Sequence, residues 1–313
     1  MAQNLMENVD VTAELERFTW RNAKWTDEKL IASSPFRDDS NPSFFVDLRK
    51  GRYYGCWHDS GAVGDEFSSG NFPKLLAFLH GETYEEACEY LREVYGVPTA
   101  DYTLEPLKLQ LHGKSKPLSE NLINPVPSKY LKKRGISEAT QTLLETGFDR
   151  GNNAVVFPWR DVGKTLGNIK YRRADCKVFW YASGGIPIRQ LIYGMYLIYE
   201  NGENEMVVTE GEVDALSFID AGYPAVALGN AHLTRYKLDL IKRSRTKKVY
   251  ICVDNDKAGR NLLQGLTAEL VAYKQLYEIK IPLQYKDANE LYCNGNNLFQ
   301  KTKKINNLSV ASF

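Results

Sequence analysis

Apolar and polar positions in the second half of the chain alternate in a repeated strand–helix rhythm. Short apolar runs predict strands at Met206–Thr209, Ala225–Leu228 and Val249–Val253. Apolar residues at helical spacing predict the intervening helices at Val213–Ala221, Leu238–Arg243 and Ala258–Tyr273. Alternation of this kind predicts a parallel sheet covered by helices, which is an α/β fold.

The first two hundred residues follow a different pattern. Short extended runs broken by turn residues between Phe36 and Phe67 predict a small β unit, and two helices follow. Thr83 and Glu86 form a capping box that opens the second of these helices. Beyond about Pro127, a short capped helix and three antiparallel strands predict a mixed α+β unit.

These changes of pattern predict five segments. The polar, Pro/Lys/Ser-rich stretch between the two early units is typical of a connector, and the Asn/Lys-rich end is typical of a loose tail. The predicted segments are a front domain at 1–100, a connector at 101–127, the mixed unit at 128–200, the α/β domain at 201–291 and a tail at 292–313.

Composition changes this picture little but excludes several protein classes. No apolar stretch approaches the roughly twenty residues that span a membrane, and the acidic first segment does not resemble a signal peptide. The five cysteines form no Cys-x-x-Cys pair, which favours reduced thiols. We therefore expect a cytoplasmic protein that does not bind membranes. Because the net charge is only +1, nucleic-acid binding has to be argued from local basic clusters.

Three acidic residues directly follow two of the predicted strands. Glu210 comes after Met206–Thr209, while Asp254 and Asp256 come after Val249–Val253. The carboxyl ends of parallel strands meet at one edge of a sheet, where open α/β folds bind ligands. Clustered carboxylates repel one another unless a cation neutralises them, and oxygen donors favour Mg²⁺ or Mn²⁺. A lone Asp-x-Asp is more typical of a helix N-cap, but two acidic elements at two strand ends favour a site.

These acidic segments resemble the Toprim signature that DnaG-type primases, topoisomerases and some nucleases share. The matching segments are Glu210 to Ala215, Gly229-Asn230 and Asp254 to Gly259, and Lys286 to Leu291 is similar to the Lys-Asp-x-Asn-Glu segment that closes this domain in primases. The resemblance implies that Glu210 is a general base or metal organiser and that Asp254, Asp256 and Asp287 hold the ions. Asp214 fits the motif near a helix start, and its direct role is left open.

A basic and aromatic stretch precedes the Toprim-like segment. Cations interleaved with aromatic rings suit a polynucleotide, although a solvated hairpin face with inward-facing rings has the same pattern. Tyr130 to Ile136, Phe157 to Asp161 and Gly167 to Arg172 resemble the basic subdomain of bacterial primases. That resemblance assigns contacts with nucleic acid or nucleotide to Arg160, Lys170, Arg172, Lys177 and Arg189, and a structural role to Arg134.

The front of the chain resembles the zinc-ribbon domain of the same primases, but its ligands are replaced. The family's Cys-Pro-Phe-His appears as Ser34-Pro35-Phe36-Arg37, and its Cys-x-x-Cys falls on Trp57 and Ser60. Cys56 and His58 cannot supply the four donors that a structural zinc requires. We predict no zinc, with hydrophobic packing of Phe44, Tyr54 and Trp57 in its place. Cations left to grip DNA are Arg37, Arg49, Lys50 and Arg52.

The resemblance, which runs from about Ser34 to Leu291, implies a DNA primase. Such an enzyme makes short RNA primers on single-stranded DNA from ribonucleoside triphosphates by two-metal nucleotidyl transfer, and a replicative helicase is a candidate partner. Two alternatives stay open: a Toprim nuclease, and a non-catalytic single-stranded-DNA-binding replisome adaptor. The retained acids argue against the adaptor, because a pure binder gains nothing from repelling carboxylates. The ligand-poor front domain and the compact length favour an origin in a phage or another mobile element.

Overall fold

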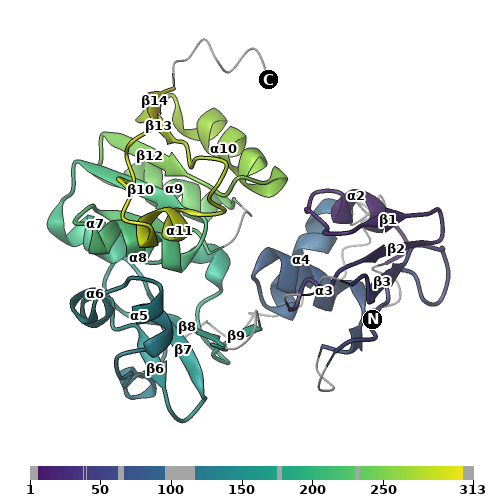
Figure 1. Cartoon of the computed structure of the whole chain (residues 1–313). Helices are drawn as coiled ribbons and strands as arrows, with labels where there is room; N and C mark the ends of the chain where they lie inside the picture. The colour runs from purple at the N-terminus through teal and green to yellow at the C-terminus, as the bar shows by residue number, and fades with distance from the viewer. Residues whose placement is uncertain are drawn as a thin grey trace, which may run out of the picture. The chain divides into compact units, whose positions relative to one another are not determined.

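The computed structural model describes residues 6–37, 39, 41–62, 67–95, 117–174, 178–229 and 233–305. These residues form two compact units, one built from residues 6–95 and one from residues 117–174 and 179–305 (Figure 1). Each unit has its own hydrophobic core. Most of the predicted connector, up to residue 116, lies outside the described ranges. Within those ranges, no helix is both long and apolar enough to cross a membrane.

The described residues of the first unit combine an antiparallel sheet with helices. In order across the sheet, the strands are β1 (Lys24–Trp25), β2 (Lys29–Ala32), β3 (Phe44–Asp47), β4 (Trp57–Asp59) and β5 (Ser69–Gly70). The helices are α2 (Val11–Leu15), α3 (Phe72–His80) and α4 (Tyr84–Tyr95). The predicted capping box is confirmed at the start of α4: the Thr83 N–H donates to Glu86 Oε2 at 2.8 Å, and the Glu86 N–H donates to Thr83 Oγ1 at 3.2 Å.

The core of the first unit is aromatic. The ring centroid of Phe36 lies 4.6 Å from that of Phe78 and 4.9 Å from that of Trp57. Phe44 and Trp57 are buried, as the sequence predicted. Tyr54 is only partly buried, and its hydroxyl donates to the Val9 carbonyl at 3.1 Å. Tyr54 therefore anchors the start of the chain to the sheet rather than filling the centre of the core.

An ion-pair network lies beside this core, within the segments that resemble a zinc motif. Arg37 Nη2 lies 2.8 Å from Asp59 Oδ1 and donates to Ser43 Oγ at 2.6 Å, and it pairs with Asp39 at 2.7 Å. Asp59 is only 2% exposed. A Cβ atom on Gly61 would lie 2.2 Å from Arg37 Nη2, so glycine at this position makes room for the guanidinium. Arg37 neutralises a buried carboxylate, and its suggested contact with DNA stays a prediction.

The second unit begins with short helices and a four-stranded antiparallel sheet. Its strands, in order, are β6 (Gly147–Asp149), β7 (Ala154–Arg160), β8 (Leu166–Arg172) and β9 (Phe179–Tyr181). Its helices are η1 (Glu120–Leu122), α5 (Lys129–Lys133), α6 (Glu138–Leu143) and η2 (Ile188–Gln190). Residues of β7 alternate between two cores, because Val155, Phe157 and Trp159 face one way and Ala154 and Val156 face the other.

A mixed sheet covered by helices completes the second unit (Figure 1). Across this sheet the order is β11 (Ala225–Ala227), β10 (Glu205–Thr209), β12 (Lys248–Cys252), β13 (Gln275–Ile279) and β14 (Thr302–Lys304), of which only β14 runs antiparallel to its neighbour. The helices are α7 (Met195–Asn201), α8 (Glu212–Asp220), α9 (Arg235–Arg243), α10 (Lys257–Leu270) and α11 (Ala288–Cys293). Val207 packs with α8 and α11, whereas Val208 packs with α9 and α10. Helices on both faces confirm the predicted α/β class.

Two predicted segment boundaries differ from the structure. Residues 117–127, assigned to the connector, pack on the four-stranded sheet: the Leu118 N–H donates to the Leu166 carbonyl at 2.8 Å, and Val126 bridges Phe148. The described part of the predicted tail, residues 292–305, also packs on this unit, because β14 pairs with β13 and Leu298 is buried. Both stretches are mostly polar in composition, but a few apolar residues pack against the rest of the unit and hold them in place.

The predicted units at 128–200 and 201–291 share one core. Trp159 from β7 and Tyr193, which precedes α7, lie in the same cluster as Val207 of β10 and Leu216 of α8. Tyr193 also pairs through its backbone with Ala227 of β11. A shared core of this kind means that the antiparallel sheet and the mixed sheet fold as one body.

Candidate active site

The predicted catalytic acids lie at the carboxyl ends of neighbouring parallel strands. β10 ends at Thr209 and β12 ends at Cys252, and these two residues are paired in the sheet. Glu210 directly follows β10, and Asp254 follows β12 by two residues. Strand register therefore brings both carboxylates to one edge of the sheet, the edge at which open α/β folds bind ligands.

Two further acids at this edge begin helices. Asp256 Oδ1 accepts the Gly259 N–H at 2.8 Å at the start of α10, and Asp287 Oδ1 accepts the Glu290 N–H at 2.8 Å at the start of α11. Asp256 is thus an N-cap, the alternative that its sequence pattern left open. A cap uses one carboxylate oxygen, so capping and cation binding do not exclude each other.

Burial and mutual repulsion raise the pKa values of these acids. Burial, together with the charges of Asp254 and Asp256, raises the pKa of Glu210 to about 8. Burial and the charges of Asp287 and Asp256 raise the pKa of Asp254 to about 6. The charges of Asp254 and Asp256 thus act on Glu210, and those of Asp256 and Asp287 act on Asp254. The joint role of these four acids as a site stays a prediction.

Asp214 in α8 belongs to the same cluster. Burial, with the charges of Asp254 and Asp287, raises its pKa to about 8. Its Oδ1 accepts the Asn289 N–H at 2.9 Å. The sequence placed Asp214 in the motif but left its role open, because only the packing of α11 against α8 brings Asp214 and Asn289 together.

Asn289 links this cluster to α5. Its side-chain amide donates to the Arg134 carbonyl at 2.7 Å and to Ser217 Oγ at 2.9 Å, and it accepts from Arg134 Nη1 at 3.1 Å. Asn289 is 1% exposed, so these hydrogen bonds satisfy a buried polar group. The contacts agree with the structural role predicted for Arg134.

The chemistry of the cluster fits a divalent cation. Every side chain in it offers only oxygen donors, which are the ligands that Mg²⁺ and Mn²⁺ prefer. Glu210 Oε2 is buried without a hydrogen-bond partner in the described ranges, and a cation would satisfy it. Those ranges contain no three His, Cys, Asp or Glu side chains that already converge as a metal site. The assignment of Glu210, Asp254, Asp256 and Asp287 as ligands stays a prediction.

Two of the predicted nucleic-acid contacts are buried in ion pairs. Arg160 is 7% exposed and donates to Glu120 Oε2 at 2.7 Å and to Glu145 Oε2 at 2.5 Å. Lys170 is also 7% exposed, and its Nζ lies 3.0 Å from Glu212 Oε1. These partners favour a structural role for both residues. A positive charge in the sequence does not by itself distinguish such a role from nucleic-acid binding.

Arg172 keeps a geometry suited to a ligand. Its guanidinium carbon lies 5.7 Å from the ring centroid of Tyr130, and its Nε is buried without a hydrogen-bond partner in the described part of the chain. The neighbouring rings of Tyr171 and Trp180 stack on each other at 5.4 Å. Arg189 lies in η2, and Lys177 lies outside the described residues. Contacts of these three cations with nucleic acid stay predictions.

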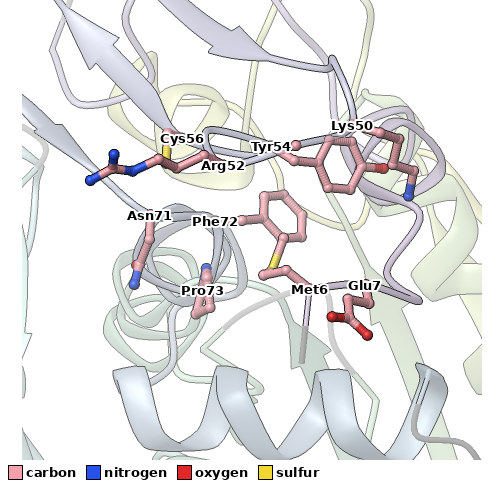
Figure 2. Close-up of a pocket in the computed structure, with 10 residues that line it drawn as sticks. Met6, Glu7, Lys50, Arg52, Tyr54, Cys56, Asn71, Phe72 and Pro73 are labelled. Atoms are coloured by element: carbon pink, nitrogen blue, oxygen red, sulfur yellow. The ribbon is translucent and has the colours of Figure 1, made fainter. Parts of the chain in front are cut away.

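A pocket in the first unit is lined in part by the basic turn between β3 and β4. Figure 2 shows the side chains of Met6, Tyr54 and Phe72 in the middle of its lining, with Lys50 and Arg52 extending to either side. Lys50 Nζ lies 4.0 Å from the Tyr54 ring centroid and donates to the Val9 carbonyl at 3.2 Å. The Arg52 guanidinium lies 5.7 Å from the Tyr53 ring. Lys50 thus has partners within the unit, which leaves its predicted DNA contact untested.

Comparison with known proteins agrees with the geometry of the second unit. A family model described as Toprim-like matches residues 207–292. The DNA primase of Thermotoga maritima is 25% identical over 93% of this chain and 58% of its own length, and that of Escherichia coli K12 is 25% identical over 74% of this chain and 48% of its own length. A crystal structure of the zinc-binding and RNA polymerase domains of Aquifex aeolicus primase covers 97% of this chain and 85% of that chain, at 21% identity and a TM-score of 0.47.

The chain spans about half the length of these two curated relatives. The matched range 207–292 contains Glu210, Asp254, Asp256 and Asp287, the acids that the fold gathers at one sheet edge. The chain therefore carries a Toprim-like domain at residues 207–292, and it is similar in sequence to DNA primases over most of its length.

Proposed function

We propose that the protein is a DNA primase that synthesises short RNA primers on single-stranded DNA from ribonucleoside triphosphates. The observation that carries the proposal is the carboxylate cluster at the ends of β10 and β12, set in the same compact unit as a sheet with basic side chains. Nucleotidyl transfer requires a cation site for phosphates and a surface that holds the polynucleotide beside it. The names of the curated relatives, which are DNA primases, support this choice.

Glu210, Asp254, Asp256 and Asp287 would hold the divalent ions, Mg²⁺ or Mn²⁺. When bound, such ions neutralise phosphate charge and polarise the reacting oxygens. Glu210, which directly follows β10, would act as a general base or would organise the ions. Asp214, fixed by the Asn289 N–H, would position the other carboxylates.

The template would lie along the β8–β9 side of the second unit. Arg172 and Arg189 are the described cations that we assign to it, together with Lys177. Binding through phosphates releases counterions, so affinity for single-stranded DNA should fall steeply with salt. We place the protein in the bacterial cytosol and propose a replicative helicase as its partner.

Incorporation of labelled ribonucleotides on mixed-sequence single-stranded DNA, with Mg²⁺ or Mn²⁺, tests the proposal. The wild type should yield short RNA products, and Asp254→Asn should lose at least about a hundredfold in rate, because one ligand carboxylate of the cluster disappears. Asp239→Asn is the matched control. Its carboxylate is 57% exposed on α9, where it pairs with Arg243, and the substitution should leave the rate unchanged.

Other outcomes separate the alternatives. Divalent-dependent cleavage of DNA without RNA synthesis would identify a Toprim nuclease. Metal-independent DNA binding without either reaction would identify the adaptor, and both results would refute the primase proposal.

A further inference from the structure

The segment between β13 and α11 is tied to the acidic turn after β12. Asn255, which lies between Asp254 and Asp256, donates from Nδ2 to the carbonyls of Ile281 at 3.1 Å and of Tyr285 at 3.2 Å. Ile281 is 5% exposed and packs in the core of the second unit. The two amide contacts therefore hold residues 281–285 beside the carboxylate cluster.

A hollow of about 380 Å³ lies between this segment and the acidic turn. Its lining includes Asp254, Asp256, Tyr285 and Lys286. Leu283, also in the lining, is 93% exposed. The volume falls within the range of small-molecule sites, and the hollow opens directly onto two of the predicted metal ligands.

Lys286 brings a positive charge to this hollow. Lys286 lines the hollow together with Asp254 and Asp256, two of the predicted metal ligands. Even so, Lys286 takes part in none of the ion pairs within the described ranges. Its backbone N–H donates to Glu290 Oε2 at 2.6 Å, which fixes the point from which the side chain extends.

An anchored lysine without a carboxylate partner, at the mouth of a cation-binding cluster, suits a phosphate. The bound divalent ions would neutralise the carboxylates of the cluster. A nucleoside triphosphate would bring further negative charge to the site, and this charge needs another cation. Lysine binds phosphate as a mobile point charge with three donors. We propose that Lys286 binds the polyphosphate of the incoming nucleoside triphosphate. The inference rests on the proposed function and names the substrate group that this part of the site holds.

Equilibrium binding, measured by calorimetry on the full chain without template, tests the role of Lys286. The ligands are ATP with Mg²⁺, Mn²⁺ alone, and a single-stranded DNA oligonucleotide. In Lys286→Ala the Kd for ATP should rise about tenfold to a hundredfold, the loss expected for one hydrogen bond to a charged group. Affinity for Mn²⁺ should stay unchanged or increase, because a repelling cation has been removed, and DNA affinity should change less than about twofold.

Lys280→Ala is the matched control. Lys280 lies six positions earlier and pairs with Glu278 at 3.5 Å, and its side chain is 54% exposed. This variant should bind ATP as the wild type does.

Several results would overturn the inference. The first is an unchanged Kd for ATP in Lys286→Ala, and the second is an equal loss of ATP affinity in Lys280→Ala. The third is a loss of DNA affinity in Lys286→Ala with ATP binding intact, which would make the ligand a phosphodiester backbone. A parallel loss of Mn²⁺ affinity would indicate a disturbed fold instead of a lost phosphate contact.

RNA synthesis by the wild type with an unchanged ATP Kd in Lys286→Ala would refute the lysine's role alone. Lys286-dependent ATP binding without RNA synthesis would refute the primase proposal alone.

Discussion

Replacing Arg37 with leucine should destabilise the first unit and leave the second unchanged. The substitution removes the cation 2.8 Å from Asp59 Oδ1 and leaves a carboxylate that is only 2% exposed. Breaking a buried ion pair costs about 3–5 kcal/mol. The Arg37 side chain is 29% exposed, and the Gly61 N–H and Ser43 Oγ still donate to Asp59. We therefore expect a smaller loss, about 2 kcal/mol.

Hydrogen–deuterium exchange on the full chain measures this loss unit by unit. A loss of about 2 kcal/mol corresponds to roughly thirtyfold faster exchange of the amides that open with the whole unit. Peptides that cover β3 and β4 report on the first unit, and peptides that cover β10 and β12 serve as the internal reference. Arg49→Leu is the matched control, because the Arg49 side chain is 62% exposed and its ion pair with Asp47 should contribute less than about 1 kcal/mol.

The same network predicts sensitivity to acid. Burial alone would raise the pKa of Asp59, but hydrogen bonds from Ser34 and Arg37 outweigh burial and lower it below its ordinary value. A lowered folded-state pKa contributes stability above the unfolded value of about 4, and this contribution is lost as pH falls through the folded value. Unchanged exchange in Arg37→Leu would refute the reasoning. So would a chelator that accelerates wild-type exchange in β3 and β4 to the same extent, because a metal would then hold the unit together.

Two further substitutions test the second unit. Gly229→Ala places a Cβ atom 2.5 Å from Trp159 Cη2 at a residue with φ of 82°. It should cost about 2–4 kcal/mol in thermal unfolding of this unit, and an unchanged Tm would contradict the tight packing. Lys170→Met leaves Glu212 buried without its cation and should cost about 3 kcal/mol. Weaker binding of single-stranded DNA at an unchanged Tm would instead assign Lys170 to the template.

The strands that the sequence predicted well are the ones that carry continuous apolar runs. β10 and β12 lie inside the mixed sheet with helices on both faces, so their central positions are apolar, and the predicted ranges match within one residue. β13 was missed because its sequence, Gln-Leu-Tyr-Glu-Ile, mixes polar and apolar residues. β14 was missed because it is an exposed strand of three residues that forms only by pairing with β13.

The residues of the candidate site also divide into those that the sequence predicted and those that it did not. Glu210 and Asp254 were predictable because their positions follow from strands that the chain itself marks. Asp214 was not assigned a role, because its place in the cluster depends on Asn289, which lies 75 positions away in α11. The Arg37–Asp59 pair was missed for the same reason, since only the folding of β4 beside residue 37 brings a carboxylate to the arginine.

The buried ion pair of Lys170 also changes how the basic residues of the antiparallel sheet are interpreted. Lys170 on β8 pairs with Glu212, the first residue of α8 and two positions beyond Glu210. The pair therefore joins the antiparallel sheet to the strand end that carries a predicted catalytic acid. Trp159 on β7 makes a second link, because it lies fully buried against Gly229 beyond the end of β11. A template held by Arg172 on β8 would consequently be fixed relative to the carboxylates by the packed core, without a hinge between the two sheets.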